Sequence, residues 1–199
     1  MKLRRSSPEE AGWGETEVGP WTRRSRRVGY QNPWLQVWHD EVTRPDGEAG
    51  IYGVIHFRNT AVGVVAIDAQ DRVALVGQHR YAFDTYHWEI PEGGSPLAED
   101  SLEGARRELV EETGLSARSW REIGRWELSN SVTDEAAVAY LATDLIQGEA
   151  QPDPEEQLEF RWLPFDEVMA MIQRGEITDA LTVLPMQALA LERARSGSD

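Results

Sequence analysis

Alternating runs of apolar and polar residues predict most elements of this chain. Residues 28–57 hold two strand-like apolar runs, and the polar segment between them carries Pro45 and Gly47 where a tight turn requires them. Further apolar runs predict strands at 61–67, 73–76, 88–90, 120–128, 136–145 and 158–163. Helical patterns predict helices at 98–113, 165–174 and 178–195, and the proline and glycine residues of 91–96 predict a loop. This mixture of strands and helices indicates an α/β (α+β) fold.

The pattern divides the chain into four segments. We expect a flexible polar arm at 1–27, a β-hairpin region at 28–58, a main domain at 59–195 and a polar tail at 196–199. The arm ends in a cluster of four arginines, Arg23, Arg24, Arg26 and Arg27. This cluster belongs either to a flexible tail or interface, or to a patch that binds nucleic acid. The acidity of the whole chain favours the first interpretation.

Composition narrows the classes of function. The 199 residues suffice for one domain with a small addition, and the 40% hydrophobic content suffices for a core. A formal net charge of −15 argues against a general affinity for nucleic acid. The chain shows no apolar run of about 18 residues, so we expect no membrane span. It contains no cysteine and begins with no secretory signal pattern, which fits the reducing cytoplasm.

The segment 93–115 carries the candidate chemistry. Gly114 is a stop signal for the predicted helix. At about 100° of rotation per residue, Glu108, Glu111 and Glu112 project from the same sector of that helix. Carboxylates at these spacings repel one another, and a divalent cation removes that repulsion. The alternative is a solvated acidic helix face. Oxygen ligands without cysteine or clustered histidine favour Mg²⁺, for which Mn²⁺ can substitute.

The same segment follows the spacing G-x5-E-x7-R-E-U-x-E-E-x-G-U, in which U is aliphatic. The nine specified positions are Gly93, Glu99, Arg107, Glu108, Leu109, Glu111, Glu112, Gly114 and Leu115. The pattern resembles the Nudix box, and the wider chain resembles the ADP-ribose pyrophosphatase branch of that superfamily. The resemblance implies an α/β/α sandwich around a mixed sheet, preceded by a small strand region that exchanges between two subunits. It therefore implies a homodimer that hydrolyses the pyrophosphate bond of a nucleoside diphosphate sugar.

The resemblance also implies the catalytic and metal-binding residues. Glu108 and Glu112 match the main metal-binding glutamates, Glu111 matches a further ligand, and the backbone carbonyl of Glu92 usually binds metal as well. Glu99 and Arg107 match residues that hold the loop and the helix together. In the acidic loop 147–157, Glu156 matches a catalytic or metal-binding glutamate, with Glu155 and Asp153 as the alternatives. The number of metal ions stays open.

Four residues are candidates for binding the substrate. Arg80 matches an arginine that contacts the diphosphate, and the alternative is a surface salt bridge. Trp34 and Tyr52 fall where relatives stack the base, although core or interface packing is the alternative for these two and for Trp38. Arg58 is a further candidate contact with the substrate.

The sequence does not identify the sugar and the base of the substrate. Ser131 occupies the position at which members that prefer ADP-ribose tend to carry a proline, so the substrate is ADP-ribose or a related nucleoside diphosphate sugar. One alternative is a non-catalytic Nudix domain that senses a ligand. Another, with the same fold, is a pyrophosphohydrolase of nucleoside triphosphates or dinucleotides.

Overall fold

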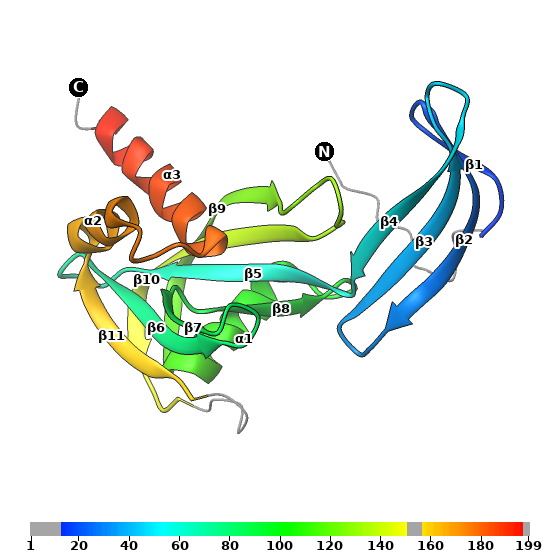
Figure 1. Cartoon of the computed structure of the whole chain (residues 1–199). Helices are drawn as coiled ribbons and strands as arrows, with labels where there is room; N and C mark the ends of the chain where they lie inside the picture. Colours follow the sequence, from blue (N-terminus) through cyan, green and yellow to red (C-terminus); the bar gives the residue numbers. More distant parts are fainter. Residues whose placement is uncertain (1–12, 151–156, 197–199) are drawn as a thin grey trace. The chain divides into compact units, whose positions relative to one another are not determined.

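The computed structural model describes residues 13–150 and 157–196. The chain forms two compact units, which we call unit 1 (Met1–Arg58 with Ser129–Glu135) and unit 2 (Asn59–Leu128 with Ala136–Asp199). Figure 1 labels the elements of both units. None of the helices in the described part of the chain combines the length and the hydrophobicity that a membrane crossing requires.

Unit 1 is an antiparallel sheet in the order β1-β2-β3-β4. The last two strands, β3 and β4, pair without interruption from Leu35–Phe57 to Thr43–Ala49, and the turn between them closes with a 2.9 Å hydrogen bond from the Arg44 N–H to the Glu48 carbonyl. The strands of the sheet are β1 (Thr16–Val18), β2 (Trp21–Gln31), β3 (Leu35–Thr43) and β4 (Ala49–Phe57). The predicted hairpin is therefore present, with two further strands ahead of it.

Those two strands differ from the flexible arm that the sequence predicts for 1–27. Most residues of β2 are exposed, but Arg23 is buried while its neighbour Arg24 is exposed. Strand β2 is stabilised by pairing along β3, an interaction that polar composition does not reveal. Residues 1–12 lie outside the described part of the chain.

Unit 2 contains two sheets, in the orders β8-β5-β10-β9 and β11-β6-β7. Strands β5 and β10 run parallel and the other pairs are antiparallel, so the first sheet is mixed. The strands are β5 (Asn59–Ala66), β6 (Arg72–Arg80), β7 (Thr85–Glu89), β8 (Glu92–Pro96), β9 (Leu115–Glu127), β10 (Ala136–Gln147) and β11 (Glu159–Pro164). The helices are α1 (Ser101–Thr113), α2 (Phe165–Arg174) and α3 (Ala180–Ser196).

The helices cover opposite faces of the mixed sheet, as Figure 1 shows. Strand β5 is buried on both faces, because Val62 and Val64 pack with Leu109 of α1, whereas Val65 packs with Met186 of α3. Side chains alternate between the two faces of a strand, so these contacts place α1 on one side and α3 on the other. The expected α/β/α sandwich with a mixed sheet is confirmed.

One segment of unit 2 corrects the prediction from sequence. The residues 91–96 were expected to form a loop, yet Glu92–Pro96 is strand β8 and pairs antiparallel with β5, Val62 lying opposite Gly93. Glycine weakens a strand locally, but it also permits a close approach of neighbouring groups. The tertiary pairing with β5 therefore outweighs the local preference for a loop, and it places β8 beside α1.

Candidate active site

Helix α1 begins at Ser101, three residues after the predicted start, and ends at Thr113 as predicted. The Asp100 side chain accepts a 2.9 Å hydrogen bond from the Leu102 N–H at the N-terminus, and Gly114 ends the helix in the left-handed conformation with a φ of 71°. Leu109 is fully buried in the core under the sheet. This anchoring orients the glutamates of the last turns. Glu112 is only 6% exposed, the Glu108 side chain is 16% exposed, and the Glu111 side chain is 44% exposed.

Strand β8 lies directly against these carboxylates. The Glu92 N–H donates a hydrogen bond of 3.0 Å to Oε2 of Glu112. A Cβ atom on Gly93 would lie 2.2 Å from the carboxyl carbon of Glu108, so that position has room only for glycine. The structure thus brings the main-chain atoms of Glu92 to Glu112, as expected for a site that uses both.

Arg107 of α1 binds residues at the N-terminal end of the Nudix-like segment. Its guanidinium donates to Glu99 at 2.9 and 3.1 Å and to the Gly94 carbonyl at 3.1 Å. It also lies 3.6 Å from Glu108 and 4.0 Å from Glu111. Burial works against its charge, but these acids outweigh burial and raise the pKa of Arg107. The arginine therefore carries fixed positive charge beside the glutamates while it holds the backbone of β8.

A second acidic cluster, which the sequence analysis did not single out, adjoins the first. Among the described residues, the Glu89, Glu92 and Asp179 side chains offer oxygen atoms within 4.8 Å of one another. Arg80 lies among them: its Nη2 donates to Glu89 and to Glu92, at 2.6 Å in each case. The Asp179 side chain also accepts a 2.7 Å hydrogen bond from the Thr182 N–H in the first turn of α3. The four residues come from β6, β7, β8 and the segment before α3.

The charges of this cluster perturb one another. Burial raises the pKa of the Glu92 carboxyl well above its ordinary value, the negative charges of Asp179 and Glu89 raise it further, and Arg80 opposes them. Burial lowers the pKa of Arg80, but Glu89 and Glu92 outweigh it, so the net shift is upward. A perturbed acid beside the box is typical of a functional site.

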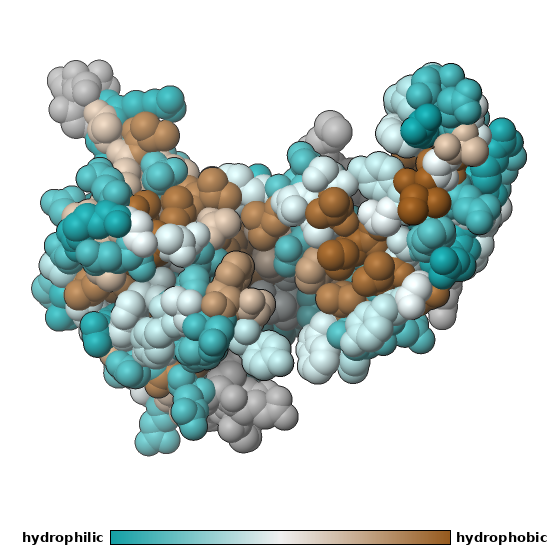
Figure 2. Space-filling view, in the orientation of Figure 1, coloured by the Kyte–Doolittle hydropathy of each residue, from teal (hydrophilic) through white to brown (hydrophobic). Residues whose placement is uncertain are grey.

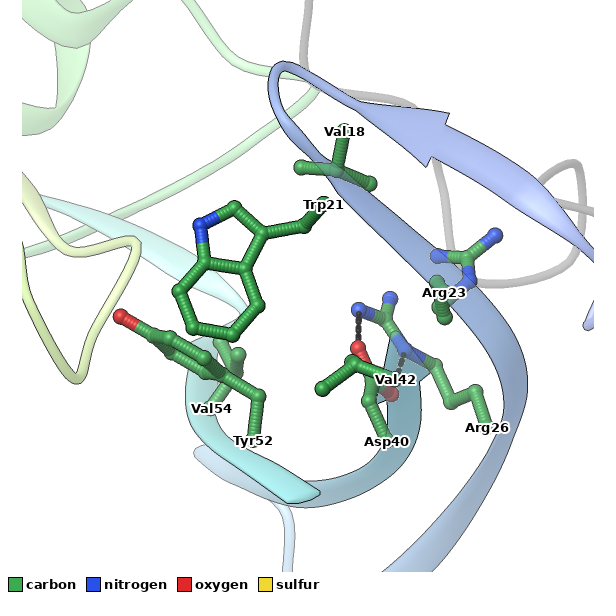
Figure 3. Close-up of a pocket in the computed structure, with 8 residues that line it drawn as sticks. All are labelled: Val18, Trp21, Arg23, Arg26, Asp40, Val42, Tyr52 and Val54. Carbon is green, nitrogen blue, oxygen red and sulfur yellow. Dashed lines mark hydrogen bonds and ion pairs between the residues drawn. The ribbon is translucent and has the colours of Figure 1, made fainter. Parts of the chain in front are cut away.

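The structure brings two of the substrate-binding candidates of unit 1 together, since the Arg58 N–H donates to the Trp34 carbonyl at 3.0 Å, whereas Tyr52 lies within β4 opposite Asp40. Tyr52 lines a pocket of about 280 Å³, where its ring meets Trp21 edge to face at 5.5 Å and its hydroxyl donates to the Ser131 carbonyl. Figure 3 shows these two rings on one side of the pocket and the ion pair of Arg26 with Asp40 on the other. Trp21 could not be identified from the sequence, because a lone tryptophan at the start of a polar strand carries no signal of its own.

The other aromatic and basic residues of unit 1 divide into buried and exposed groups. Trp34 is 65% exposed just before β3, and Arg58, also exposed, follows β4. Trp38 is instead buried. Its ring stacks on the ring of His56 with the centroids 4.2 Å apart, and the guanidinium carbon of Arg26 lies 3.8 Å from the centroid of the Trp38 ring. The alternative of core packing is thus confirmed for Trp38. Within the arginine cluster, Arg24 pairs with Glu15 at 2.7 Å and Arg26 pairs with Asp40.

The remaining acidic candidates, Asp153, Glu155 and Glu156, lie outside the described residues. Among the described candidates, Glu92, Glu108 and Glu112 meet at the junction of β8 and α1, with Arg80 bound to the side chain of Glu92.

Comparison with known proteins now adds to this geometry. Residues 57–182, more than half of the chain, match the NUDIX domain. The chain belongs to the Nudix family. Residues 21–55 match the nucleoside diphosphate sugar hydrolase N-terminal domain, so β2, β3 and most of β4 also have a counterpart among known proteins.

Relatives of this Nudix hydrolase carry several names. This chain is 32% identical to the ADP-ribose pyrophosphatase of Mycobacterium tuberculosis, and the match covers 75% of this chain and 73% of the relative. It is 29% identical to the CMP-5'-(N-acetyl-N-hydroxy-3-aminopropyl)phosphonate hydrolase of Streptomyces rubellomurinus, over 85% and 82% of the two chains. The crystal structure of an ADP compounds hydrolase superposes with a TM-score of 0.79 at 19% identity, covering 92% of this chain and 98% of that one, and so shares its fold.

The residues of this Nudix site fit a divalent cation. The donors at the junction of β8 and α1 are oxygen atoms of glutamates, the set that Mg²⁺ and Mn²⁺ prefer. The missing side chain at Gly93 leaves the Glu108 carboxylate in contact with the backbone, and the Glu92 N–H orients the Glu112 carboxylate. Such outer hydrogen bonds commonly fix the ligands of a metal.

Proposed function

We propose that this Nudix hydrolase cleaves the pyrophosphate bond of a nucleoside diphosphate sugar with the help of Mg²⁺, for which Mn²⁺ can substitute. ADP-ribose and water would give AMP and ribose 5-phosphate. The observation that carries the proposal is the junction of β8 and α1, where Glu92 and Gly93 lie against the carboxylates of Glu112 and Glu108.

In this proposal the glutamates of α1 hold the cation. Glu108 and Glu112 would bind it, Glu111 and the Glu92 carbonyl would complete the oxygen ligands, and Arg107 would keep β8 against the helix. A bound divalent cation supplies positive charge to the diphosphate oxygens and lowers the pKa of a bound water. Glu156 would orient or deprotonate the attacking water, with Glu155 and Asp153 as the alternatives.

The substrate would be recognised through aromatic and basic side chains. Trp34 or Tyr52 would stack on the base, since an aromatic ring offers the face that stacking requires. Arg58 would contact the phosphates, and so would Arg80 through the N–H groups that Glu89 and Glu92 leave available. The names of two relatives specify ADP-ribose and a CMP-linked phosphonate, so they support a substrate in which a nucleoside monophosphate is joined to another group.

A homodimer belongs to the same proposal. Unit 1 presents apolar side chains to solvent, and Figure 2 shows brown, hydrophobic surface on this unit. Ile51 is 71% exposed, and Tyr30 and Val18 are exposed as well. A second copy of the chain that covers them would account for this surface. Light scattering on the eluting protein tests it: we expect twice 22.5 kDa, and a lower mass for Ile51→Lys. A wild-type monomer at micromolar concentration would contradict the homodimer.

The test of the reaction is a product screen. ADP-ribose, GDP-mannose, UDP-glucose, NADH and diadenosine polyphosphates are each incubated with Mg²⁺ and with Mn²⁺, and the products are separated by anion-exchange chromatography. We expect a nucleoside monophosphate and a sugar phosphate from at least one nucleotide sugar. Heat of binding without any product would identify a ligand-sensing domain instead, and cleavage restricted to the dinucleotides would redirect the assignment to that class.

A further inference from the structure

Arg80 is the cation at the centre of three acidic side chains. Its Nη2 bridges Glu89 and Glu92 at 2.6 Å each, and its Nε lies 3.0 Å from both carboxylate oxygens of Glu89. Asp179 offers a third carboxylate within 4.8 Å of the other two. The Glu89 and Glu92 side chains are only 2% and 12% exposed, whereas Arg80 is 36% exposed. The arginine therefore supplies compensating charge to acids that solvent barely reaches.

The two carboxylates that Arg80 joins stand at the ends of one short turn. Glu89 ends β7 and Glu92 begins β8, with Ile90 and Pro91 between them. The Ile90 N–H is held by the Thr182 hydroxyl oxygen at 3.0 Å. The Glu92 N–H is held by Glu112 at 3.0 Å. The side chain of Glu92 thus binds Arg80 while its backbone N–H binds the carboxylate of a predicted metal ligand, so one residue connects the arginine to that ligand.

Removal of Arg80 would leave three carboxylates close together with no arginine among them. Like charges at this separation repel, most strongly where burial reduces screening by solvent. Glu89 is buried and Asp179 is held by the N–H of Thr182, so we expect the repulsion to displace Glu92, which lies at the first position of β8. Movement of Glu92 would break its contact with Glu112 and disturb the place where the cation binds.

We propose that Arg80 is a positioning residue for the cation site: by holding the Glu92 side chain, it keeps the backbone of β8 against Glu112. The proposal rests on the proposed function, in which the glutamates of α1 bind the cation. It differs from the expectation that Arg80 acts mainly through the diphosphate. A diphosphate contact acts only when substrate is present, whereas a positioning residue acts on the cation alone.

The experiment measures Mn²⁺ binding to the full-length protein without substrate, from the signal of free Mn²⁺ in electron paramagnetic resonance. The variants are Arg80→Gln, Glu92→Gln and the double variant. Arg80→Gln should weaken Mn²⁺ binding about tenfold or more, the size of effect typical of residues that orient metal ligands. The double variant should recover most of that loss, because Glu92→Gln removes the repulsion that Arg80 otherwise neutralises.

Arg72→Gln is the matched control, since Arg72 begins the same strand and pairs with the partly buried Asp68 at 2.6 Å. It should leave Mn²⁺ binding within about twofold, and circular dichroism checks that every variant is folded. Equal Mn²⁺ binding by Arg80→Gln and wild type, together with a raised KM for ADP-ribose, would overturn the inference and leave the proposed function intact. Failure of the double variant to recover would also overturn it. A wild-type protein that binds no Mn²⁺ would overturn the proposed function and this inference together.

Discussion

The backbone N–H of Glu92 donates a hydrogen bond to the carboxylate of Glu112 across 3.0 Å. The first residue begins β8 and the second lies in the last turn of α1, twenty positions later. This contact joins the strand to the helix at the point where the proposed cation would bind. Because Glu112 is nearly buried, its carboxylate is costly to leave without a compensating charge or donor.

Replacement of Glu112 by glutamine should abolish most activity and preserve the fold. The amide keeps the shape of the side chain but removes the charge, so we expect kcat to fall by about 100-fold or more. Glu103→Gln, an exposed position in the first turn of the same helix, is the control and should keep its activity. Steady-state kinetics with Mg²⁺ provides the measurement. Near-normal turnover by Glu112→Gln would remove Glu112 from the metal site.

The position of Gly93 tolerates no side chain. Gly93→Ala would place a Cβ 2.2 Å from the carboxyl carbon of Glu108, so either β8 or the glutamate must move. We expect turnover to fall by about 100-fold, with weaker Mn²⁺ binding, because positioning errors of this size are costly at a reacting centre. Gly14→Ala, which would meet nothing within 4 Å, is the matched control. Wild-type kinetics for Gly93→Ala would show that Glu108 has no fixed place in the site.

Trp34 should contribute to substrate binding more than to turnover. Its ring is 65% exposed, and stacking on a base is worth about 1–3 kcal/mol. Trp34→Ala should therefore raise KM for ADP-ribose about tenfold while kcat changes little, and Trp34→Phe should retain most of the affinity. The comparison of the two variants in initial-rate measurements separates stacking from other effects. If Trp34→Ala and Trp34→Phe both have the KM of the wild type, the base does not bind at Trp34.

Tyr52 should act through its ring and through its hydroxyl. The hydroxyl donates to the Ser131 carbonyl, and the ring packs edge to face on Trp21. We expect Tyr52→Phe to retain KM and to lower the thermal midpoint slightly, since one hydrogen bond is worth about 1 kcal/mol. Tyr52→Ala should raise KM in addition to lowering the thermal midpoint, because it also removes the ring. A normal KM for Tyr52→Ala, measured alongside its melting temperature, would confine this residue to a structural role.

Asp68 should make unfolding depend on pH. Burial would raise its pKa, but the hydrogen bonds that it accepts from Arg72 and Gln70 outweigh burial and hold the pKa below its ordinary value. The folded state thus favours the charged form, so this stabilisation is complete above the unfolded pKa of about 4 and is lost as the pH falls through the folded value.

Asp68→Asn should therefore lower the free energy of unfolding by about 1–2 kcal/mol at pH 7, the usual value of charge-assisted hydrogen bonds. The difference from wild type should shrink towards pH 3. Urea denaturation at pH 7 and pH 3 measures both values. A difference that is independent of pH would show that the charge of Asp68 does not stabilise the turn between β5 and β6.

Local signals predicted the helix of the site well. The N-terminal cap at Asp100, the periodicity that buries Leu109 and the left-handed Gly114 are each properties of a few neighbouring residues. The shared sector of Glu108 and Glu112 follows from the geometry of the helix itself. The Nudix spacing added the roles that these residues are proposed to have.

Other features depend on residues far apart in the chain. Strand β8 looked like a loop, because its pairing with β5 lies outside the range of local preference. Trp21 and Tyr52 meet because β1 to β4 form one sheet, and no spacing in the sequence indicates that contact. The same reason hid the acidic cluster, since Arg80, Glu89 and Asp179 come from three separate elements.

The sequence by itself determined the helix that presents Glu108 and Glu112, because helical periodicity acts over one or two turns and needs no distant partner. Only the tertiary structure decided what those carboxylates face, namely the Glu92 N–H and the Gly93 backbone. It also decided that Arg80 binds Glu89 and Glu92 in the same place. Such contacts arise when β6, β7 and β8 are assembled around α1, and strand pairing and burial across the whole unit set their distances.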